Sequence, residues 1–422
     1  MNEDVPPKLV PFLRDLDEFI ASEIVPLQER DDNGRFFDHR REWARTDFEA
    51  GGVARREWRE LLAEARRRAD RAGFLRYSLP AELGGRDGSN EDMTVIREYL
   101  AAKGLGLHND LQDESSVVGN FPVVQVLLRF GTPEQKQEHV EDAITGRRTV
   151  AFGLTEPDHG SDATWLETRA VRSGGDWVIN GAKRWNSGLP EATHDLIFAR
   201  TSGEDGDAKG ITAFLVPTNS PGFEVPFVWW TFNMPSDHAE VRLTDVRVPD
   251  SAIVGEEGAG LALAQHFVHE NRIRQAASSL GAGAYCVAES VRYARERVTF
   301  GQALARRQAI QWPLAELHTE AAMIRALVRR TAIRLDENPD GKTGATALSA
   351  EVSMCNYRAN RFVCEAADRA MQVHGGLGYS RHTPFEHIYR HHRRYRITEG
   401  SEEIQLRRVA QHLFGFTSAG KR

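Results

Sequence analysis

The stretch HAEVRLTDVRVPDSAIVGEEGAGLALAQ, residues 238–265, contains the change of pattern that decides the fold. Its first half alternates apolar and polar residues and is rich in valine, which is typical of a strand with one buried face. The segment GEEGAG (255–260) then interrupts the alternation, and its glycine spacing does not match a dinucleotide-binding loop. From residue 261 onward apolar residues recur every three or four positions, as in a helix. We therefore expect a β domain to end here and a helical bundle to begin.

The same two patterns extend in both directions from this stretch. Short alternating segments upstream (DWVINGAKRW, HDLIFART, GITAFLVPT and GFEVPF) predict antiparallel strands of a compact barrel or sandwich. Downstream, helical patterns close to thirty residues long predict a bundle of long antiparallel helices. The fold class is therefore α+β and mostly α, with an N-terminal helical domain (1–147), a middle β domain (148–255) and a C-terminal helical bundle (256–422).

The N-terminal block shows helical periodicity and one well-marked helix start. In TPEQKQEHVEDAI, Thr132 is a good N-cap, Pro133 suits the first helical position, and Gln135 completes a capping box.

Bulk composition excludes several classes of protein. The 422 residues carry a net charge of −7, so no global basic field would attract nucleic acid or an anionic membrane. No apolar run is long enough for a membrane span, and the first residues lack the features of a signal peptide, so we expect a cytoplasmic protein. The three cysteines are widely spaced, which predicts buried, inert thiols and neither a disulfide framework nor a zinc site.

Two motifs in the middle domain offer polar groups to a planar ligand. AFGLTEPDHGSD (151–162) combines hydroxyls and a glycine in a loop, although a plain surface loop would have the same composition. NGAKRWNSG (180–188) begins with Asn180-Gly181, a hairpin-turn signal. Trp185 and Ser187 then lie two residues apart on one face of a strand, where an indole and a hydroxyl suit an aromatic cofactor. A core tryptophan beside an unrelated serine is the alternative.

Two more motifs lie in the C-terminal block. ARERVTFG (294–301) places an arginine and a threonine just past a long helix, where they could meet a phosphate or only complete the helix end. The glycines of MQVHGGLGYS (371–380) allow backbone amides to approach a pyrophosphate, but also suit a simple helix terminus. HExxH and GxSxG are absent, and His391 and His392 lie in a basic run that we interpret as a solvated face, not a metal site.

The segment YRITEGSEEIQ (395–405) places Glu399 beside Gly400, just before a helix start. Ser401 is a good N-cap, and acids at 402 and 403 suit the positive end of a helix dipole. The simple interpretation is a capped helix. The stronger hypothesis is that Glu399 projects into a pocket as a general base.

Taken together and in this order, these motifs resemble those of the acyl-CoA dehydrogenase family. The pattern comprises LTEPxxGSD, NGxKxW with a hydroxyl two residues on, DVRVP, RxTFG, QVxGGxGY and EGSxEIQ, and it spans nearly the whole chain. The resemblance implies a C-terminal four-helix bundle, FAD bound at a subunit interface, an acyl-CoA thioester substrate, and electron-transfer flavoprotein as acceptor. It also implies a homotetramer built as a dimer of dimers, or a homodimer.

The resemblance further implies roles for individual residues of the middle domain. Trp185 matches the indole that packs on the flavin, and Ser187 matches the hydroxyl that bonds to N5. The loop beside the flavin ring, whose serine also lies near the thioester, is matched by Phe152, Leu154, Thr155, Gly160 and Ser161.

In the C-terminal domain, the residues matching those that reach the FAD of a neighbouring subunit are Arg297, Thr299 and Gln308. The pyrophosphate segment and the helix start after it are matched by Gln372, His374, Gly375, Gly376, Ser401 and Glu403. Arg272 matches an arginine near the substrate and the base, and Glu399 matches the base itself, with Gly400 providing the freedom to place it.

The family reaction explains why a carboxylate would stand at position 399. A proton leaves the carbon α to the thioester while a hydride leaves the β carbon for the flavin, and a base must lie within hydrogen-bond reach in a dry pocket. Some relatives carry this base just before the arginine, but that position here is Asn271, which cannot accept the proton. Glu270 lies about 100° further round the helix.

Three features depart from the family pattern. The Trp185–Gly188 segment is shorter than usual, Glu403 replaces a common glutamine, and VWWTFNMPSDHAEV (228–241) contains Trp229 and Trp230, which either shape an unusual acyl pocket or fill a core. The acyl group therefore remains open. An oxidase or monooxygenase of the same fold, similar to nitroalkane oxidase, is the alternative function.

Overall fold

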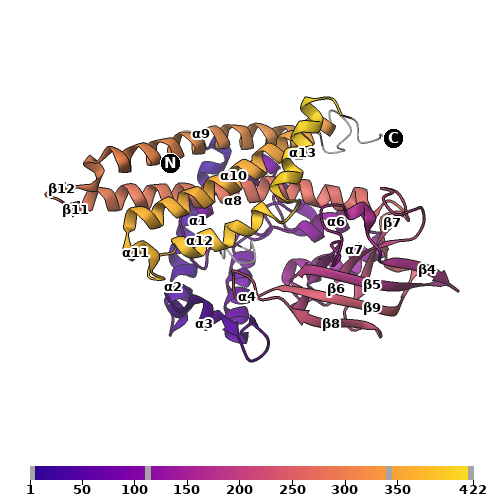
Figure 1. The fold of residues 1–422 in the computed structure, drawn as a ribbon. Coiled ribbons are helices and arrows are strands. Elements are labelled where there is room, and N and C mark those ends of the chain that lie inside the picture. Colours follow the sequence, from indigo (N-terminus) through magenta and orange to yellow (C-terminus); the bar gives the residue numbers. More distant parts are fainter. Residues whose placement is uncertain (1–4, 110–115, 339–344, 417–422) are drawn as a thin grey trace. The chain divides into compact units, whose positions relative to one another are not determined.

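The computed structural model describes residues 5–109, 116–338 and 345–416. It separates the chain into two compact units (Figure 1): the first comprises residues 1–44, 64–120 and 269–422, and the second comprises residues 45–63 and 121–268. Each unit therefore draws on separate stretches of the chain. The division into three sequential domains remains a prediction.

The N-terminal helices of the first unit are short. They are α1 (Val10–Phe19), α2 (Val25–Glu29), α3 (Arg41–Arg45), the second half of α4 (Arg56–Arg71), and α5 (Asn90–Ala101). A capping box starts α5: Asp92 N–H donates to the Ser89 hydroxyl, and the Asp92 carboxylate accepts from Ser89 N–H.

Helices form the remainder of the first unit, and the first three of them are long, as expected. They are α8 (Gly260–Glu296), α9 (Gln308–Asp336), α10 (Ala345–His374), α11 (Gly376–Tyr379), α12 (Phe385–Arg393) and α13 (Glu402–Leu413). One apolar core joins α8, α9, α10 and α12, with small residues such as Ala276 and Ala359 allowing close helix approach around Phe362. The three cysteines are buried and free, as predicted, and burial raises the pKa of Cys364 to about 11.

The second unit contains two whole helices, α6 (Pro122–Phe130) and α7 (Pro133–Thr145), together with residues 56–63 of α4, residues 260–268 of α8 and the β-sheet. The predicted capping box of α7 is confirmed, because Gln135 N–H donates to Thr132 Oγ1 at 3.2 Å and Thr132 N–H to Gln135 Oε1 at 3.1 Å. The strands are β3 (Val150–Gly153), β4 (Arg169–Ser173), β5 (Asp176–Ser187), β6 (His194–Arg200), β7 (Ile211–Pro217), β8 (Phe223–Val228), β9 (His238–Pro249) and β10 (Ile253–Val254).

The sheet is open and its pairing is mostly antiparallel. Its order is β10-β7-β6-β4-β5-β9-β8, and β3 pairs in parallel with β6. Among the described strands no pairing joins β8 to β10, so the sheet does not close into a barrel. Its buried face packs Trp177, Ile179 and Phe214 into a separate core.

Two local predictions are wrong. Asn180-Gly181 is not a hairpin turn, because β5 continues through it. The pairing of β5 with β9 instead has a β-bulge here, and Gly181 adopts a φ of 149°. The Asn180 side chain instead exchanges hydrogen bonds with Asp245 across the bulge, at 3.1 and 2.9 Å. His391 and His392 are not on a solvated face either: α12 directs them inward, at 1% and 0% exposure, and burial lowers the pKa of His392 to about 3.

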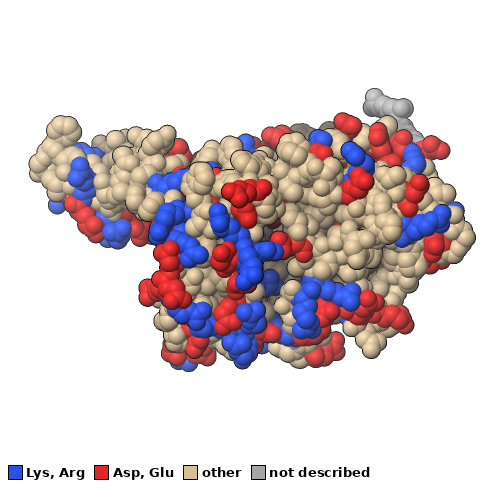
Figure 2. Space-filling view, turned by 90° about the horizontal axis from the view of Figure 1, so that it is seen from below, with Lys and Arg blue, Asp and Glu red and all other residues tan. Residues whose placement is uncertain are grey.

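Charges are mixed on the surface drawn in Figure 2, where basic and acidic side chains lie among one another without a broad patch of one sign. Among the helices of the described residues, none has both the length and the apolar character required to cross a bilayer.

Candidate active site

Glu399 lies in a tight turn between two helical segments of the first unit. The chain leaves α12 through a short 3₁₀ turn (Arg394–Arg396) and enters α13 at Glu402. Glu399 and Gly400 both take left-handed backbone conformations, with φ of 56° and 87°. Such a conformation costs a non-glycine residue about 1–2 kcal/mol, so surrounding contacts must hold it.

The backbone carbonyl of Glu399 accepts hydrogen bonds from two side chains. Arg272 of α8 donates through Nε at 2.8 Å and also through Nη2, and Gln405 of α13 donates through Nε2 at 3.1 Å. A Cβ at position 400 would lie 2.8 Å from Arg272 Nη2 and would displace the guanidinium, and the φ of 87° also favours glycine there. Burial lowers the pKa of Arg272 to about 10, and nearby Glu399 partly offsets this.

The Glu399 carboxylate is held separately from its backbone. Asn271, the residue before Arg272 on α8, donates from Nδ2 to Glu399 Oε1 at 3.2 Å. Asn271 in turn accepts from Asn120 Nδ2 at 3.2 Å. Two consecutive residues of α8 therefore bind different parts of Glu399: Arg272 binds its backbone carbonyl and Asn271 binds its carboxylate.

The helix start after Glu399 differs from the simple capping interpretation. Ser401 stands at the N-cap position, but its side chain makes no capping hydrogen bond. Glu402 pairs with Arg396 at 2.8 Å and with Arg361 at 3.1 Å, and the hydrogen bond from Arg396 lowers the pKa of Glu402 to about 2. Glu403 is exposed. The acid at 402 therefore ties the turn to α10.

The predicted cofactor face of the second unit lies on β5. A bulge against β9 places Trp185 at φ 68°, and Trp185 and Ser187 are both exposed while Asn186 between them is fully buried. Both side chains are exposed, although the bulge interrupts the regular alternation on which the prediction rested. The Ser187 hydroxyl shares a hydrogen bond of 3.0 Å with His238 Nδ1, a partner that the sequence pattern did not indicate.

Aromatic side chains surround Trp185. Its ring centroid lies 4.8 Å from that of Trp229, and Trp229 meets Phe227 edge-on at 4.9 Å. Trp230 faces elsewhere: its indole N–H donates to the Gly51 carbonyl at 2.8 Å, and its ring meets Phe48 edge-on. The two adjacent tryptophans therefore have different neighbours, and only Trp229 packs on the candidate cofactor residue.

The loop 151–162 is partly buried and partly open. Phe152 stacks on Phe267 at 4.4 Å, whereas Gly160 and Ser161 are exposed. Leu154 and Thr155 are half-buried and use their backbone carbonyls, which accept from Lys183 Nζ at 3.3 Å and from Arg184 N–H at 2.9 Å respectively. The loop therefore has two exposed small residues, Gly160 and Ser161, next to a segment that hydrogen bonds hold to β5.

Beneath β5 lies a polar cluster that sequence reasoning missed. Lys183 Nζ, fully buried, contacts Glu156 Oε1 at 2.8 Å. Asn186 donates to the buried carboxylate of Asp195, whose other oxygen has no hydrogen-bond partner among the described residues. Burial raises the pKa of Asp195 to about 7. In the sequence these polar residues occur among apolar ones, as solvent-facing residues of a strand do. The pattern therefore did not show that they are buried.

The remaining predicted cofactor residues lie at the ends of the long helices. Arg297 and Gln308 are exposed, and Thr299 is half-buried in the small hairpin of β11 (Val298–Thr299) and β12 (Gln302–Ala303). Gln372 is also exposed at the end of α10. His374 differs, because its ring is buried, stacks on Tyr293 at 4.3 Å and bonds to the Ala370 carbonyl at 2.8 Å.

Each unit by itself has features that suit one part of a flavin dinucleotide. A Cβ on Gly375 or Gly376 would meet no atom within 4 Å, so the backbone there is open to a phosphate. Trp185 is 44% exposed and offers a ring face, and the Ser187 side chain is also exposed. His374 is the exception, since its side chain faces inward and only its backbone is available.

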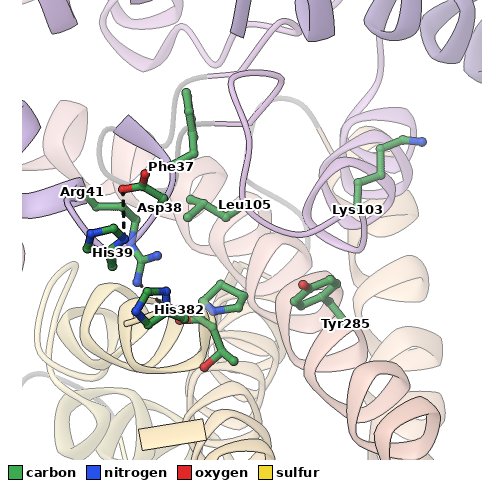
Figure 3. Close-up of a pocket in the computed structure, with 10 residues that line it drawn as sticks. Phe37, Asp38, His39, Arg41, Lys103, Leu105, Tyr285 and His382 are labelled. Atoms are coloured by element: carbon green, nitrogen blue, oxygen red, sulfur yellow. Dashed lines mark hydrogen bonds and ion pairs between the residues drawn. The ribbon is translucent and has the colours of Figure 1, made fainter. Parts of the chain in front are cut away.

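A separate cavity of about 250 Å³ lies in the first unit (Figure 3), lined by Phe37, Asp38, His39, Arg41, Lys103, Leu105, Tyr285, His382, Thr383 and Pro384. His39 and His382 lie together with ring centroids 4.8 Å apart. Its cations already have acidic partners: Arg41 pairs with Glu386 at 2.6 Å and Lys103 with Asp17 at 2.7 Å. Within the described residues, no group of three or more acidic, histidine or cysteine side chains could hold a metal ion.

Comparison with known proteins identifies the family. The N-terminal, middle and C-terminal domain models of acyl-CoA dehydrogenases match residues 31–147, 151–246 and 258–414. The chain is 33% identical to a 3-(aryl)acrylate reductase of Clostridium sporogenes, over 81% of this chain and 87% of that protein. It is 30% identical to the caffeyl-CoA reductase-Etf complex subunit CarC of Acetobacterium woodii, over 79% and 85%.

A solved structure agrees with this result. Butyryl-CoA dehydrogenase from Megasphaera elsdenii superposes with a TM-score of 0.76 at 26% identity, over 98% of this chain and all of that one. The chain therefore belongs to the acyl-CoA dehydrogenase family, a class of flavin-linked oxidoreductases.

Several residues of the candidate site had no signal in the sequence. Gln405 belongs to the EGSxEIQ pattern, but nothing there indicates its burial, at 1% exposure, in a helix whose other residues are partly or fully exposed. Asn120 is 151 positions from the residue it contacts. His238 was noted only as part of an unusual loop. Each acts through a contact between distant segments, which periodicity does not reveal.

Proposed function

We propose that this protein interconverts an acyl thioester and its 2,3-enoyl thioester with FAD as cofactor, and that Glu399 exchanges the α proton. The observation that carries the proposal is the Glu399 turn. Arg272 and Gln405 hold its backbone carbonyl, and Asn271 holds one carboxylate oxygen. A carboxylate so constrained, on a left-handed turn, is positioned as a base needs to be.

In the dehydrogenating direction, the Cα–H bond breaks and its proton passes to the Glu399 carboxylate as the Cα–Cβ double bond forms. FAD, when bound, supplies the acceptor for the two electrons and proton of the β hydride. The half-buried position of Glu399 limits water around the transferred proton, which strengthens the carboxylate as a base. The backbone N–H of residue 399 and a cofactor hydroxyl would polarise the thioester carbonyl, as the family resemblance implies.

Cofactor binding is assigned to two groups of residues. Trp185 and Ser187 of β5 would pack on the flavin ring and bond to its N5, and the separate loop of Phe152, Leu154, Thr155, Gly160 and Ser161 would lie beside the ring. The phosphates and the interface with a second copy in a homodimer or homotetramer would be bound by Arg297, Thr299, Gln308, Gln372, His374, Gly375, Gly376, Ser401 and Glu403. The open backbone at the glycine pair supports this assignment.

Two relatives are named as reductases, and this favours the reverse direction as the second candidate. The same residues would then act in reverse, with protonated Glu399 donating to the α carbon of an enoyl thioester. Because one relative belongs to a complex named for Etf, electron-transfer flavoprotein is the proposed redox partner in either direction.

Anaerobic mixing tests this function. The purified protein should be yellow, release FAD on denaturation, and lose flavin absorbance with at least one member of an acyl-CoA panel that includes butyryl-CoA and 3-arylpropionyl-CoA. For the reverse direction, the reduced protein should be reoxidised by the matching enoyl-CoA. Glu399→Gln should bind FAD normally and bleach at least about 1000-fold more slowly, because it removes the proton acceptor.

The outcomes separate the alternatives. Bleaching at the normal rate in Glu399→Gln would show that another group is the base. Oxygen consumption with peroxide release, in the absence of any electron-transfer partner, would indicate an oxidase of the same fold instead.

A further inference from the structure

A continuous line of hydrogen bonds reaches the Glu399 carboxylate from within the first unit. Asn271 Nδ2 donates to Glu399 Oε1 at 3.2 Å, and Asn120 Nδ2 donates to Asn271 Oδ1 at 3.2 Å. Arg274 Nη1 donates to Asn120 Oδ1 at 2.6 Å, and Glu270 lies 3.7 Å from Arg274 Nη2. The line thus joins a segment near residue 120, the α8 helix and the turn at 399.

The two ends of this line determine the orientation of both amides. An arginine side chain can only donate hydrogen bonds, and an ionised carboxylate can only accept them. The oxygen of Asn120 must therefore face Arg274 and its nitrogen must face Asn271. It follows that the oxygen of Asn271 faces Asn120 and its nitrogen faces Glu399. This orientation does not depend on an arbitrary choice between amide rotamers.

These hydrogen bonds are formed between buried side chains. Asn271 is 8% exposed and Arg274 is 4% exposed, so water competes little for their hydrogen-bonding groups. Arg272, between them on the helix, points to the backbone carbonyl of Glu399 and not to Oε1 in its hydrogen bonds. Asn271 thus contacts the carboxylate itself, at Oε1.

We propose that Asn271 is a positioning residue for the base, and that Asn120 and Arg274 fix its amide so that it always presents a donor to Glu399 Oε1. The proposal rests on the proposed function, in which Glu399 exchanges the α proton. The amide holds Oε1 of the carboxylate, and so limits rotation of the Glu399 side chain. An asparagine at a position where some relatives carry the base itself therefore has a direct part in orienting the base.

The amide donor also stabilises the charged form of the carboxylate, because a hydrogen bond to an anion favours ionisation. Other charged groups near this turn include Arg272, Arg274 and Glu270 on α8, Arg408 on α13, which acts on Arg272, and the Arg396–Glu402–Arg361 cluster. None of them is altered when Asn271 is replaced by alanine. Any change in pH dependence then reports on the amide contact.

The first variant is Asn271→Ala in the FAD-loaded protein. Loss of a hydrogen bond to a charged group is expected to slow anaerobic flavin reduction by about 10–100-fold, with little change in the substrate concentration that gives half-maximal rate. The acid limb of the pH–rate profile should move upward by about half to one pH unit. Exchange of the substrate α hydrogen in D₂O, measured by mass spectrometry, should slow in parallel because it reports proton transfer directly.

Asn271→Asp tests the direction of the contact. This substitution keeps the shape but places a second carboxylate against Glu399, and two neighbouring carboxylates resist ionising together. The acid limb should move upward by more than in Asn271→Ala. Asn120→Ala, which frees the Asn271 amide without touching Glu399, should shift the limb in the same direction by a smaller amount.

Ser290→Ala is the matched control, because it removes a buried side-chain hydrogen bond on the same helix, to the Cys286 carbonyl at 2.7 Å. It should leave rate and pH profile unchanged. If Glu399→Gln abolishes bleaching but Asn271→Ala retains the normal rate and profile, this inference is wrong while the proposed function stands. If Glu399→Gln bleaches normally, the proposed function fails first. Equal slowing of Asn271→Ala at every pH, with no shift and a matching loss of thermal stability, would mean only a structural role.

Discussion

Two candidate functional residues, one in each unit, have left-handed backbones although neither is glycine, and they are held by different forces. Glu399 (φ 56°) is held by directional hydrogen bonds from Arg272, Gln405 and Asn271. Trp185 (φ 68°) is held by a β-bulge and by the aromatic ring of Trp229. A base must keep its angle and distance to a single proton, whereas an indole that packs on a ring needs only a broad flat contact.

The polar arrangement is more sensitive to the loss of one partner. Removal of a donor leaves a buried acceptor without compensation, while removal of part of an aromatic contact reduces stability in proportion to the area lost. We therefore expect substitutions around Glu399 to have sharp effects and those around Trp185 to have graded ones.

Among the residues that hold Glu399 and Trp185 in place, the largest effect is expected for Arg272→Ala. It removes both guanidinium hydrogen bonds to the Glu399 carbonyl and should lower the free energy of unfolding by about 3 kcal/mol. Flavin reduction should slow by about 100-fold or more, because the base loses its position. Denaturant unfolding and stopped-flow absorbance measure the two effects. A variant with normal flavin reduction would contradict the view that hydrogen bonds to the backbone position this base.

Asp195→Asn, in the polar cluster beneath β5, should raise the free energy of unfolding where Arg272→Ala lowers it. In the folded protein the pKa of Asp195 is about 7, against 3.8 when unfolded, so between these values only the folded state keeps the proton. Stability therefore falls as pH rises from about 4 to 7. Asparagine cannot ionise, and the variant should be more stable than the parent by about 2 kcal/mol at pH 8.

Measurement at pH 4 is the control for Asp195→Asn. At pH 4 the parent carboxyl is already protonated in the folded state, so parent and variant should unfold at similar denaturant concentrations. A gain in stability of equal size at pH 4 and pH 8 would contradict the assignment to ionisation.

Trp229→Ala should have a moderate and graded effect. The side chain is half-buried, and loss of its contact with Trp185 should cost about 1–2 kcal/mol of unfolding free energy. If Trp185 packs on the flavin, the variant should also bind FAD more weakly, as measured by fluorescence on titration of the cofactor-free protein. Trp230→Ala is the matched comparison, and it should leave FAD affinity unchanged because Trp230 contacts Phe48 and not Trp185.

The smallest effect is expected for Glu402→Gln in the turn after Glu399. The ion pairs with Arg396 and Arg361 hold the pKa of Glu402 at about 2, so their stabilisation is present above pH 4.5 and is lost as pH falls from 4.5 to 2. Because these partners are partly exposed, the loss at pH 7 should be about 1 kcal/mol. A plot of the free energy of unfolding against pH should fall less steeply between pH 4.5 and pH 2 in the variant than in the parent. An unchanged slope would show that the ion pairs contribute nothing to stability.

The periodic features of the fold could be read from the sequence because they depend on local spacing. The alternation in HAEVRLTDVRVP became β9, the repeat after Gly260 became α8, and Thr132 and Gln135 form the predicted capping box. A hydrophobic period and a cap involve residues within a few positions of one another, so the physical cause is present in the chain itself.

Contacts between distant segments were decided only by the tertiary structure. Asn180-Gly181 has the composition of a turn, yet pairing with Asp245 made it a bulge, and burial between helices overrode the basic character of the His391–His392 run. The same holds for the candidate base. The sequence by itself marked Glu399 and its flexible neighbour Gly400, but Asn271, Arg272 and Gln405 became its partners only when α8 and α13 packed against the turn.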